Sequence, residues 1–222
     1  MNDGFTYEFG ERTAQLETYE WERIWWEHID DLSKKRILII GDSISCGYRD
    51  ILNKMFKGEV YADGLGTSKA VDNPAYPMLI DYMRAQYQDY DVIQFNNGLH
   101  GWHLSDEEYA SHYQGLLHYV KESFPEKKLI VALSTPVRKA KDASVFDERN
   151  ARVIERNRIA SEIAKNLEAE ILDLYTPLFD KPMLYREDGV HLLDEGYELL
   201  AKQCLDKIKE TEYKKYGVIF SF

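Results

Sequence analysis

The sequence predicts a three-layer α/β/α sandwich built around five parallel strands. Three observations lead to this fold class. Five short apolar segments alternate with segments whose apolar residues recur every three or four positions. The first apolar segment lacks any polar alternation, which is typical of a strand buried on both faces of a parallel sheet. No repeat or change of composition divides residues 35–222, so we expect them to form a single domain.

The first strand is expected at Arg36–Ile40, and it leads directly into Gly41, Asp42 and Ser43. Open α/β sheets bind their ligands at the carboxyl ends of the strands, which is where Ser43 would lie. A helix with an apolar face follows, so Ser43 would also stand near free backbone N–H groups. These residues alone predict either a nucleophile at Ser43 or a helix cap formed by Asp42 or Ser43.

Residues 1–34, which precede this strand, are acidic and aromatic. Between Thr18 and Asp31, aromatic and aliphatic side chains recur at spacings of three and four, which fits one face of a helix. We therefore expect a helical N-terminal extension packed on the domain.

The rest of the chain continues the alternation of strands and helices. The further strands are expected at Glu59–Ala62, Asp91–Phe95, Lys128–Ser134 and Glu170–Leu174. A capping box at Ser105–Glu108 and Asp194 each begin a predicted helix. Three loops carry the polar residues of interest: a tight one at Asp63–Ser68, one with amides and imidazoles at Asn96–His103, and a long charged one at Thr135–Asn150.

Composition limits the partners of this protein. The formal net charge of -11 argues against nucleic acid and anionic membranes, which both require a basic surface. The two cysteines, Cys46 and Cys204, have no metal-ligand spacing. No apolar run is long enough to span a membrane. The first residues lack a basic stretch followed by an apolar core, so a soluble, cytoplasmic protein is expected unless a leader has been removed.

Ser43 and two residues near the C-terminal end of the chain form a candidate catalytic triad. Asp188 and His191 follow the last predicted strand, so the topology brings them to the same edge of the sheet as Ser43. A serine hydroxyl needs a base to act as a nucleophile near neutral pH, and His191 can be that base. Asp188 can hold the second ring nitrogen and stabilise the imidazolium. The backbone N–H groups of Ser43 and Gly66, with an asparagine side chain, would bind the oxyanion.

The motifs Gly41-Asp42-Ser43 and Asp188-Gly189-Val190-His191 resemble those of the SGNH or GDSL hydrolase superfamily. The resemblance implies a flavodoxin-like fold and a serine esterase that uses neither metal nor organic cofactor. It also implies that Ser43 is the nucleophile, that Asp188 and His191 are its partners, and that Gly66 is the glycine of the second family motif.

The third family motif, usually Gly-x-Asn-Asp, differs in this chain, which has Asn96-Asn97-Gly98-Leu99-His100. Aligning Gly98 with the family glycine places His100 where the family has its oxyanion-binding asparagine. Distance from the strand end favours Asn97 or Asn96 instead. We choose Asn97, because an amide N–H donates in every protonation state and a neutral imidazole nitrogen need not.

The function predicted is hydrolysis of carboxylic esters, with O-acetyl or other short acyl esters of carbohydrates as substrates and an acyl-serine intermediate. The altered third motif resembles a variation in relatives that act on acetylated carbohydrates. An acyltransferase, a thioesterase or a lysophospholipase with the same triad is the alternative. A second alternative is a carbohydrate-binding module on this fold that has lost turnover.

Overall fold

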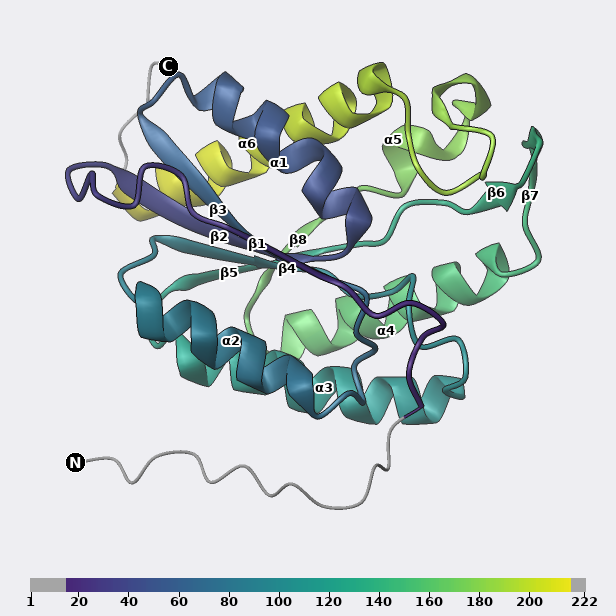
Figure 1. Cartoon of the computed structure of the whole chain (residues 1–222), viewed down its shortest axis with the longest axis horizontal. Coiled ribbons are helices and arrows are strands. Elements are labelled where there is room, and N and C mark those ends of the chain that lie inside the picture. Colours follow the sequence, from purple (N-terminus) through teal and green to yellow (C-terminus); the bar gives the residue numbers. More distant parts are fainter. Residues whose placement is uncertain (1–14, 217–222) are drawn as a thin grey trace.

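A six-stranded sheet forms the middle layer of the molecule (Figure 1). The computed structural model describes residues 15–216, with side chains up to residue 211. In spatial order, the strands are β1 (Glu22–Trp25), β3 (Val60–Thr67), β2 (Lys35–Gly41), β4 (Val92–Phe95), β5 (Lys128–Ala132) and β8 (Glu170–Leu172). β1 pairs with β3 in antiparallel fashion, and every other pairing in this sheet is parallel. The five strands expected from the sequence are confirmed, and their order is the flavodoxin-like one.

Helices cover both faces of the sheet (Figure 1). On one face lie α1 (Ser43–Phe56) and α6 (Asp194–Tyr216), and on the other α2 (Ala75–Gln86), α3 (Asp106–Ser123) and α4 (Asn150–Asn166). Shorter elements complete the chain: the hairpin strands β6 (Arg138–Lys139) and β7 (Asp142–Phe146), the single-turn α5 (Thr176–Phe179) and the 3₁₀ turn η1 (Pro182–Leu184). The predicted α/β/α sandwich is therefore confirmed.

β2 is the central strand and is buried on both faces. Ile37 and Ile39 pack into the apolar cluster beneath α1 and α6, whereas Leu38 and Ile40 pack into the cluster with α2, α3 and α4. Alternate residues of a strand point to opposite faces, so a continuous apolar run supplies both cores at once. The strand next to β2 on one side is β3 and on the other β4. The crossover connections diverge here, so the carboxyl ends of β2 and β4 form the switch point at which open α/β sheets bind their ligands.

The helix predicted between Thr18 and Asp31 is wrong, because this segment contains the strand β1. The aromatic spacing also fits a strand. Ile24 and Trp26 pack on the α2–α3 side, whereas the Trp25 ring lies on the other side, 5.7 Å from the Arg49 guanidinium. β1 covers the outer edge of β3, whose backbone groups would otherwise be left unpaired. Residues 1–14 of the predicted N-terminal extension and residues 217–222 of the predicted domain lie outside the described residues.

Two predicted loops contain more regular structure than expected. Residues Asp63–Thr67 belong to β3 and were not predicted as strand, because glycines at 64 and 66 favour a turn. Pairing on both sides, with β2 and β1, keeps them extended. The loop Thr135–Asn150 contains the β6–β7 hairpin.

Among the described residues, no helix combines the length and apolarity needed to span a bilayer.

Candidate active site

Ser43 stands where the central strand β2 passes into α1. Gly41 ends the strand, and Asp42 is the N-cap, whose Oδ1 accepts a hydrogen bond from Ile44 N–H at 2.9 Å. Asp42 thus carries out the capping role, and this leaves the half-buried Ser43 side chain free of it. The backbone N–H of Ser43 belongs to the first turn of α1, where the helix dipole favours negative charge.

The structure brings Ser43, Asp188 and His191 into one hydrogen-bonded chain. Ser43 Oγ lies 2.9 Å from His191 Nε2, and His191 Nδ1 lies 2.7 Å from Asp188 Oδ2. Asp188 Oδ1 accepts from the backbone N–H groups of Val190 and His191 at 2.9 and 2.8 Å. Burial works to raise the pKa of Asp188, but these hydrogen bonds and the imidazole hold it below its usual value. An ionised Asp188 accepts a hydrogen bond from Nδ1–H, so the proton stays on Nδ1 and Nε2 is left to accept the proton of Ser43.

The β6–β7 hairpin fixes the loop that carries Asp188. Arg138 N–H donates to Gly189 O and Lys141 N–H to Glu187 O, both at 2.7 Å. The Arg138 guanidinium in turn donates to backbone carbonyls of Ala143 and of Phe179. The long charged segment Thr135–Asn150 therefore acts as a brace for the candidate catalytic acid.

Gly189 is the tightest point of this brace, and Gly189→Ala is expected to lower kcat about 100-fold. Its φ is +72°, and an added Cβ would lie 2.1 Å from Arg138 O, so the loop with Asp188 must shift. Ester hydrolysis measures the effect. Gly58→Ala is the matched control, because Gly58 has φ +79° with open space around it. Equal kcat values for the two variants would contradict the bracing role.

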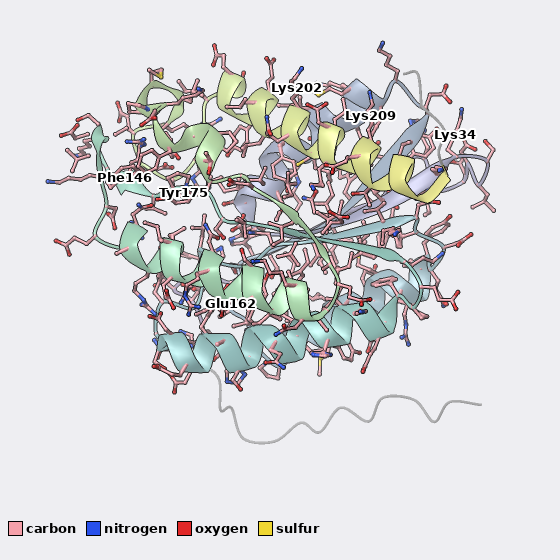
Figure 2. The ribbon with its side chains drawn as sticks, turned by 180° about the vertical axis from the view of Figure 1, so that it is seen from behind. Lys34, Phe146, Glu162, Tyr175, Lys202 and Lys209 are labelled. Atoms are coloured by element: carbon pink, nitrogen blue, oxygen red, sulfur yellow. The ribbon has the colours of Figure 1, made fainter. Side chains whose placement is uncertain are left out.

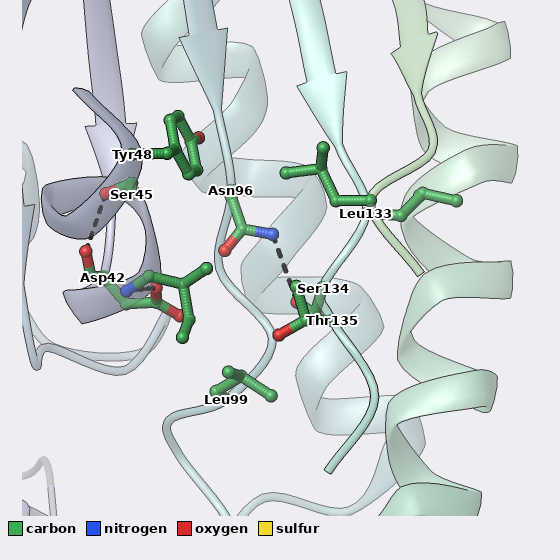
Figure 3. A pocket seen from close by; sticks show the side chains of 10 residues that line it. Asp42, Ser45, Tyr48, Asn96, Leu99, Leu133, Ser134 and Thr135 are labelled. Carbon is green, nitrogen blue, oxygen red and sulfur yellow. Dashed lines mark hydrogen bonds between the residues drawn. The ribbon is translucent and has the colours of Figure 1, made fainter. Parts of the chain in front are cut away.

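The two asparagines of the loop after β4 already have partners in the structure. Asn96 uses its Nδ2 group for Ala132 O at 2.7 Å and Ser134 Oγ at 3.1 Å. Figure 3 shows the Asn96 side chain, beside the turn with Asp42, reaching across to Ser134. Asn97 is buried and donates from Nδ2 to Lys69 O at 2.8 Å. Both amides thus tie the loop to neighbouring backbone, and the oxyanion role of Asn97 stays a prediction.

A small cavity lies between the turn that carries Ser43 and the loop after β4 (Figure 3). Its lining includes Asp42, Ile44, Asn96 and Leu99, and its volume is about 10 Å³. This space holds no more than a single water molecule, so it is not a substrate pocket. It does show that the turn with Ser43 and the loop Asn96–His100 pack against each other, as expected at the switch point of the sheet.

Gly66 is part of the sheet and pairs with Gly41 on one side and Arg23 on the other. Ser68 N–H donates to Trp21 O at 3.1 Å in the same antiparallel register. Hydrogen-bonded and non-hydrogen-bonded pairs alternate along an antiparallel ladder. Gly66 is two residues before Ser68, so its N–H also points towards β1, at Arg23. This pairing speaks against the oxyanion role predicted for Gly66.

His100 keeps a half-buried ring at the end of the same loop. Its Nδ1 lies 3.6 Å from Glu17 Oε1. The loop backbone around it is held by Arg156 of α4, whose guanidinium donates to Gly98 O at 3.0 Å, and to His100 O and Gly101 O at 2.6 Å each.

Glu17 and Arg156 are the residues that sequence reasoning missed. Arg156 is fully buried, with its guanidinium 4.6 Å and 4.4 Å from the ring centroids of Trp102 and Tyr109. The sequence held one signal for Arg156. It lies on the apolar stripe of α4 between Val153 and Ala160, where a charged side chain is rarely buried unless it is paired. Nothing in the sequence around Glu17 marks it.

Comparison with known proteins places this fold. No family model and no curated protein matches the sequence. Among solved structures, a carbohydrate acetylesterase from Sinorhizobium meliloti superposes with a TM-score of 0.66 at 16% identity, over 80% of this chain and 100% of that one. An acetyl xylan esterase gives 0.62 at 18%, over 78% and 99% of the two chains. A GDSL-like lipase from Bacteroides thetaiotaomicron gives 0.62 at 16%, over 80% and 89%. The chain therefore has the three-layer fold of GDSL-like lipases and acetylesterases, which is the fold that its SGNH/GDSL motifs implied.

Proposed function

We propose that the protein is a serine hydrolase of the SGNH/GDSL type that cleaves carboxylic esters, with acetyl and other short acyl esters of carbohydrates as substrates. The observation that supports this most is the continuous hydrogen-bonded chain from Ser43 Oγ through both nitrogens of His191 to Asp188. A helix cap at Ser43 would need neither a base nor an acid, and Asp42 already provides the cap.

The reaction follows from these groups. Ser43 Oγ attacks the ester carbonyl carbon while His191 Nε2 takes the hydroxyl proton, and the carbonyl electron pair moves onto oxygen. When this tetrahedral species collapses, the C–O bond to the alcohol breaks, and the imidazolium protonates the departing alcohol. Water, deprotonated by His191, then attacks the acyl carbon; when this second tetrahedral species collapses, the bond to Ser43 Oγ breaks, the imidazolium returns the proton to Oγ, and the carboxylic acid leaves. The Ser43 N–H, at the start of α1, lies where it can stabilise the oxyanion.

The carbohydrate ester is proposed on two grounds. Two of the proteins with the same fold are described as a carbohydrate acetylesterase and an acetyl xylan esterase. The side chains of Asp188 and His191 are 49% and 39% exposed, so the triad opens to solvent rather than to a deep apolar tunnel. An open site of this kind suits a bulky polar alcohol that carries a small acyl group.

One observation favours a second candidate, esters with longer acyl chains. The rings of Phe146 in the hairpin and Phe179 in α5 contact each other in a tilted arrangement with centroids 5.1 Å apart, and both are partly exposed beside the brace of Asp188. Tyr175, near Phe146 in Figure 2, also contacts Phe179. Met183, at 67% exposure, adds to this apolar rim. Such a rim suits an apolar chain.

The test combines active-site labelling with a substrate series. We expect a fluorophosphonate probe to modify Ser43, identified by mass spectrometry, and we expect acetate release from acetylated xylo-oligosaccharides. p-Nitrophenyl esters from two to twelve carbons distinguish the two candidates, because a short-acyl enzyme loses activity as the chain grows and the second candidate gains it. Absence of both labelling and turnover in the folded protein would leave the non-catalytic module as the better hypothesis.

A further inference from the structure

Glu17, in the segment before β1, reaches across the catalytic edge to the loop that follows β4. Its Oε1 accepts a hydrogen bond from Gly101 N–H at 2.8 Å and lies 3.6 Å from His100 Nδ1. The side chains of Glu17 and His100 are 26% and 20% exposed, so water screens this pair only in part. One carboxylate thus fixes both the loop backbone and one side of the imidazole ring.

His100 lies close enough to the turn with Ser43 for the charge of Asp42, the residue before Ser43, to act on its ring. The preceding residue, Leu99, lines the same small cavity as Asp42 and Ile44, which flank Ser43. The Arg156 guanidinium donates a hydrogen bond to the His100 carbonyl, which fixes the backbone at this position. Of the three polar side chains Asn96, Asn97 and His100, only His100 has a nitrogen, Nε2, without a hydrogen-bond partner among residues 15–211.

The charge on His100 decides whether Nε2 is useful to an oxyanion. With Nδ1–H held by Glu17, a neutral ring has a bare Nε2, which would repel a developing negative charge. An imidazolium has N–H donors on both nitrogens. The groups that face the ring are Glu17 and Glu20 from the N-terminal segment and Asp42 from the nucleophile turn, while Arg156 of α4 meets only its carbonyl.

These acids outweigh burial. Burial alone would lower the pKa of His100, but the interaction of its ring N–H with the Glu17 carboxylate, which accepts, and the charges of Asp42, Glu17 and Glu20 raise it above its ordinary value. The pKa of Glu17 falls correspondingly, chiefly through its hydrogen bond with His100. Both shifts favour the carboxylate form of Glu17 and the imidazolium form of His100.

We propose that Glu17 is a positioning residue that holds His100 as an imidazolium, and that His100 Nε2–H donates to the oxyanion formed at Ser43. This role rests on the proposed hydrolase function. It assigns to His100 the task for which the sequence favoured Asn97, and it makes the N-terminal segment a part of the active site.

The test is the alkaline limb of the pH profile of kcat/KM. The native enzyme loses the Nε2–H donor as the pH rises through the pKa of His100. Glu17→Gln removes the nearby negative charge, so we expect the alkaline limb to shift to lower pH by about one unit. Between the old and new limbs, kcat should fall about tenfold with KM little changed. Glu22→Gln is the matched control. Glu22 lies in β1 and pairs with Lys69, so its loss removes an equal charge and leaves the limb in place.

A second variant keeps the proposal falsifiable where Glu17→Gln fails to fold. His100→Asn replaces the imidazole with a donor that does not titrate, so the alkaline limb should disappear. NMR titration of the His100 ring in native protein and in Glu17→Gln reports the same coupling without turnover. An active Glu17→Gln or His100→Asn enzyme with the native limb would overturn the proposal. A native protein that neither hydrolyses esters nor labels at Ser43 fails earlier, on the proposed function itself.

Discussion

Ser43→Ala is expected to lower kcat for ester hydrolysis by about 10⁴–10⁶-fold, because in the proposed mechanism it removes the atom that forms the acyl intermediate. The hydroxyl makes a single hydrogen bond within the described residues, to His191 Nε2, and its side chain is only half-buried. The variant should therefore fold normally, with a free energy of unfolding within about 1 kcal/mol of the native value. Single-turnover acetate release and chemical denaturation measure the two quantities.

Ser111→Ala is the matched control, since Ser111 is an exposed serine on α3 away from the triad. It should retain both full turnover and labelling by a fluorophosphonate. Turnover of Ser43→Ala near the native rate would show that the nucleophile is elsewhere or that the activity comes from a contaminant, and either result removes the basis of the proposed mechanism.

The sheet and the meeting of the three candidate triad residues were predictable because their signals are local. The apolar run that ends in Gly41 needs no knowledge of its neighbours to be assigned as a buried strand, and both of its faces are indeed covered. Asp188 and His191 are three residues apart, so one loop supplies both. Parallel topology then brings this loop to Ser43, because the carboxyl ends of parallel strands share one edge.

The N-terminal segment was mispredicted because its outcome depends on a distant strand. The aromatic residues between Trp21 and Trp26 satisfy both helical and strand spacing, so the pattern alone cannot separate them. What decides is the free edge of β3, where residues 64–67 pair with the four residues of β1. Such an edge becomes visible only after the sheet has formed.

The loop after β4 shows a second limit of the same kind. Asn97 was the favoured oxyanion donor on chemical grounds, and its amide is indeed a permanent donor. Its partner, the carbonyl of Lys69, comes from the end of a different strand. His100 is the alternative donor, and its acidic partner Glu17 is 83 positions away in the sequence. A single sequence cannot indicate which of several donors is already engaged.

Arg36→Met is expected to reduce the free energy of unfolding by about 3–5 kcal/mol, which is a large part of the stability of a domain this size. Arg36 Nη1 donates to both carboxylate oxygens of Asp63 at 2.9 Å each, and both side chains are 0% exposed. Removing the guanidinium leaves a buried carboxylate without its counter-charge. Urea denaturation at neutral pH should show a lower midpoint with an unchanged slope. Arg158→Met is the control, because its ion pairs with Glu155 and Glu162 lie on the surface and its loss should leave the midpoint nearly unchanged.

The double variant Arg36→Met/Asp63→Leu should recover part of this loss, because a buried ion pair replaced on both sides by apolar groups is often close to neutral. Recovery should remain incomplete for a structural reason. Arg36 also donates to the carbonyls of Glu27 and His28 at 2.6 and 2.5 Å, and Asp63 accepts from Glu27 N–H at 2.9 Å. These bonds fasten the segment that follows β1, and the segment that precedes β1 carries Glu17. A double variant that regained its stability yet lost the alkaline activity of the native enzyme would connect this buried pair to His100 through the strand between them.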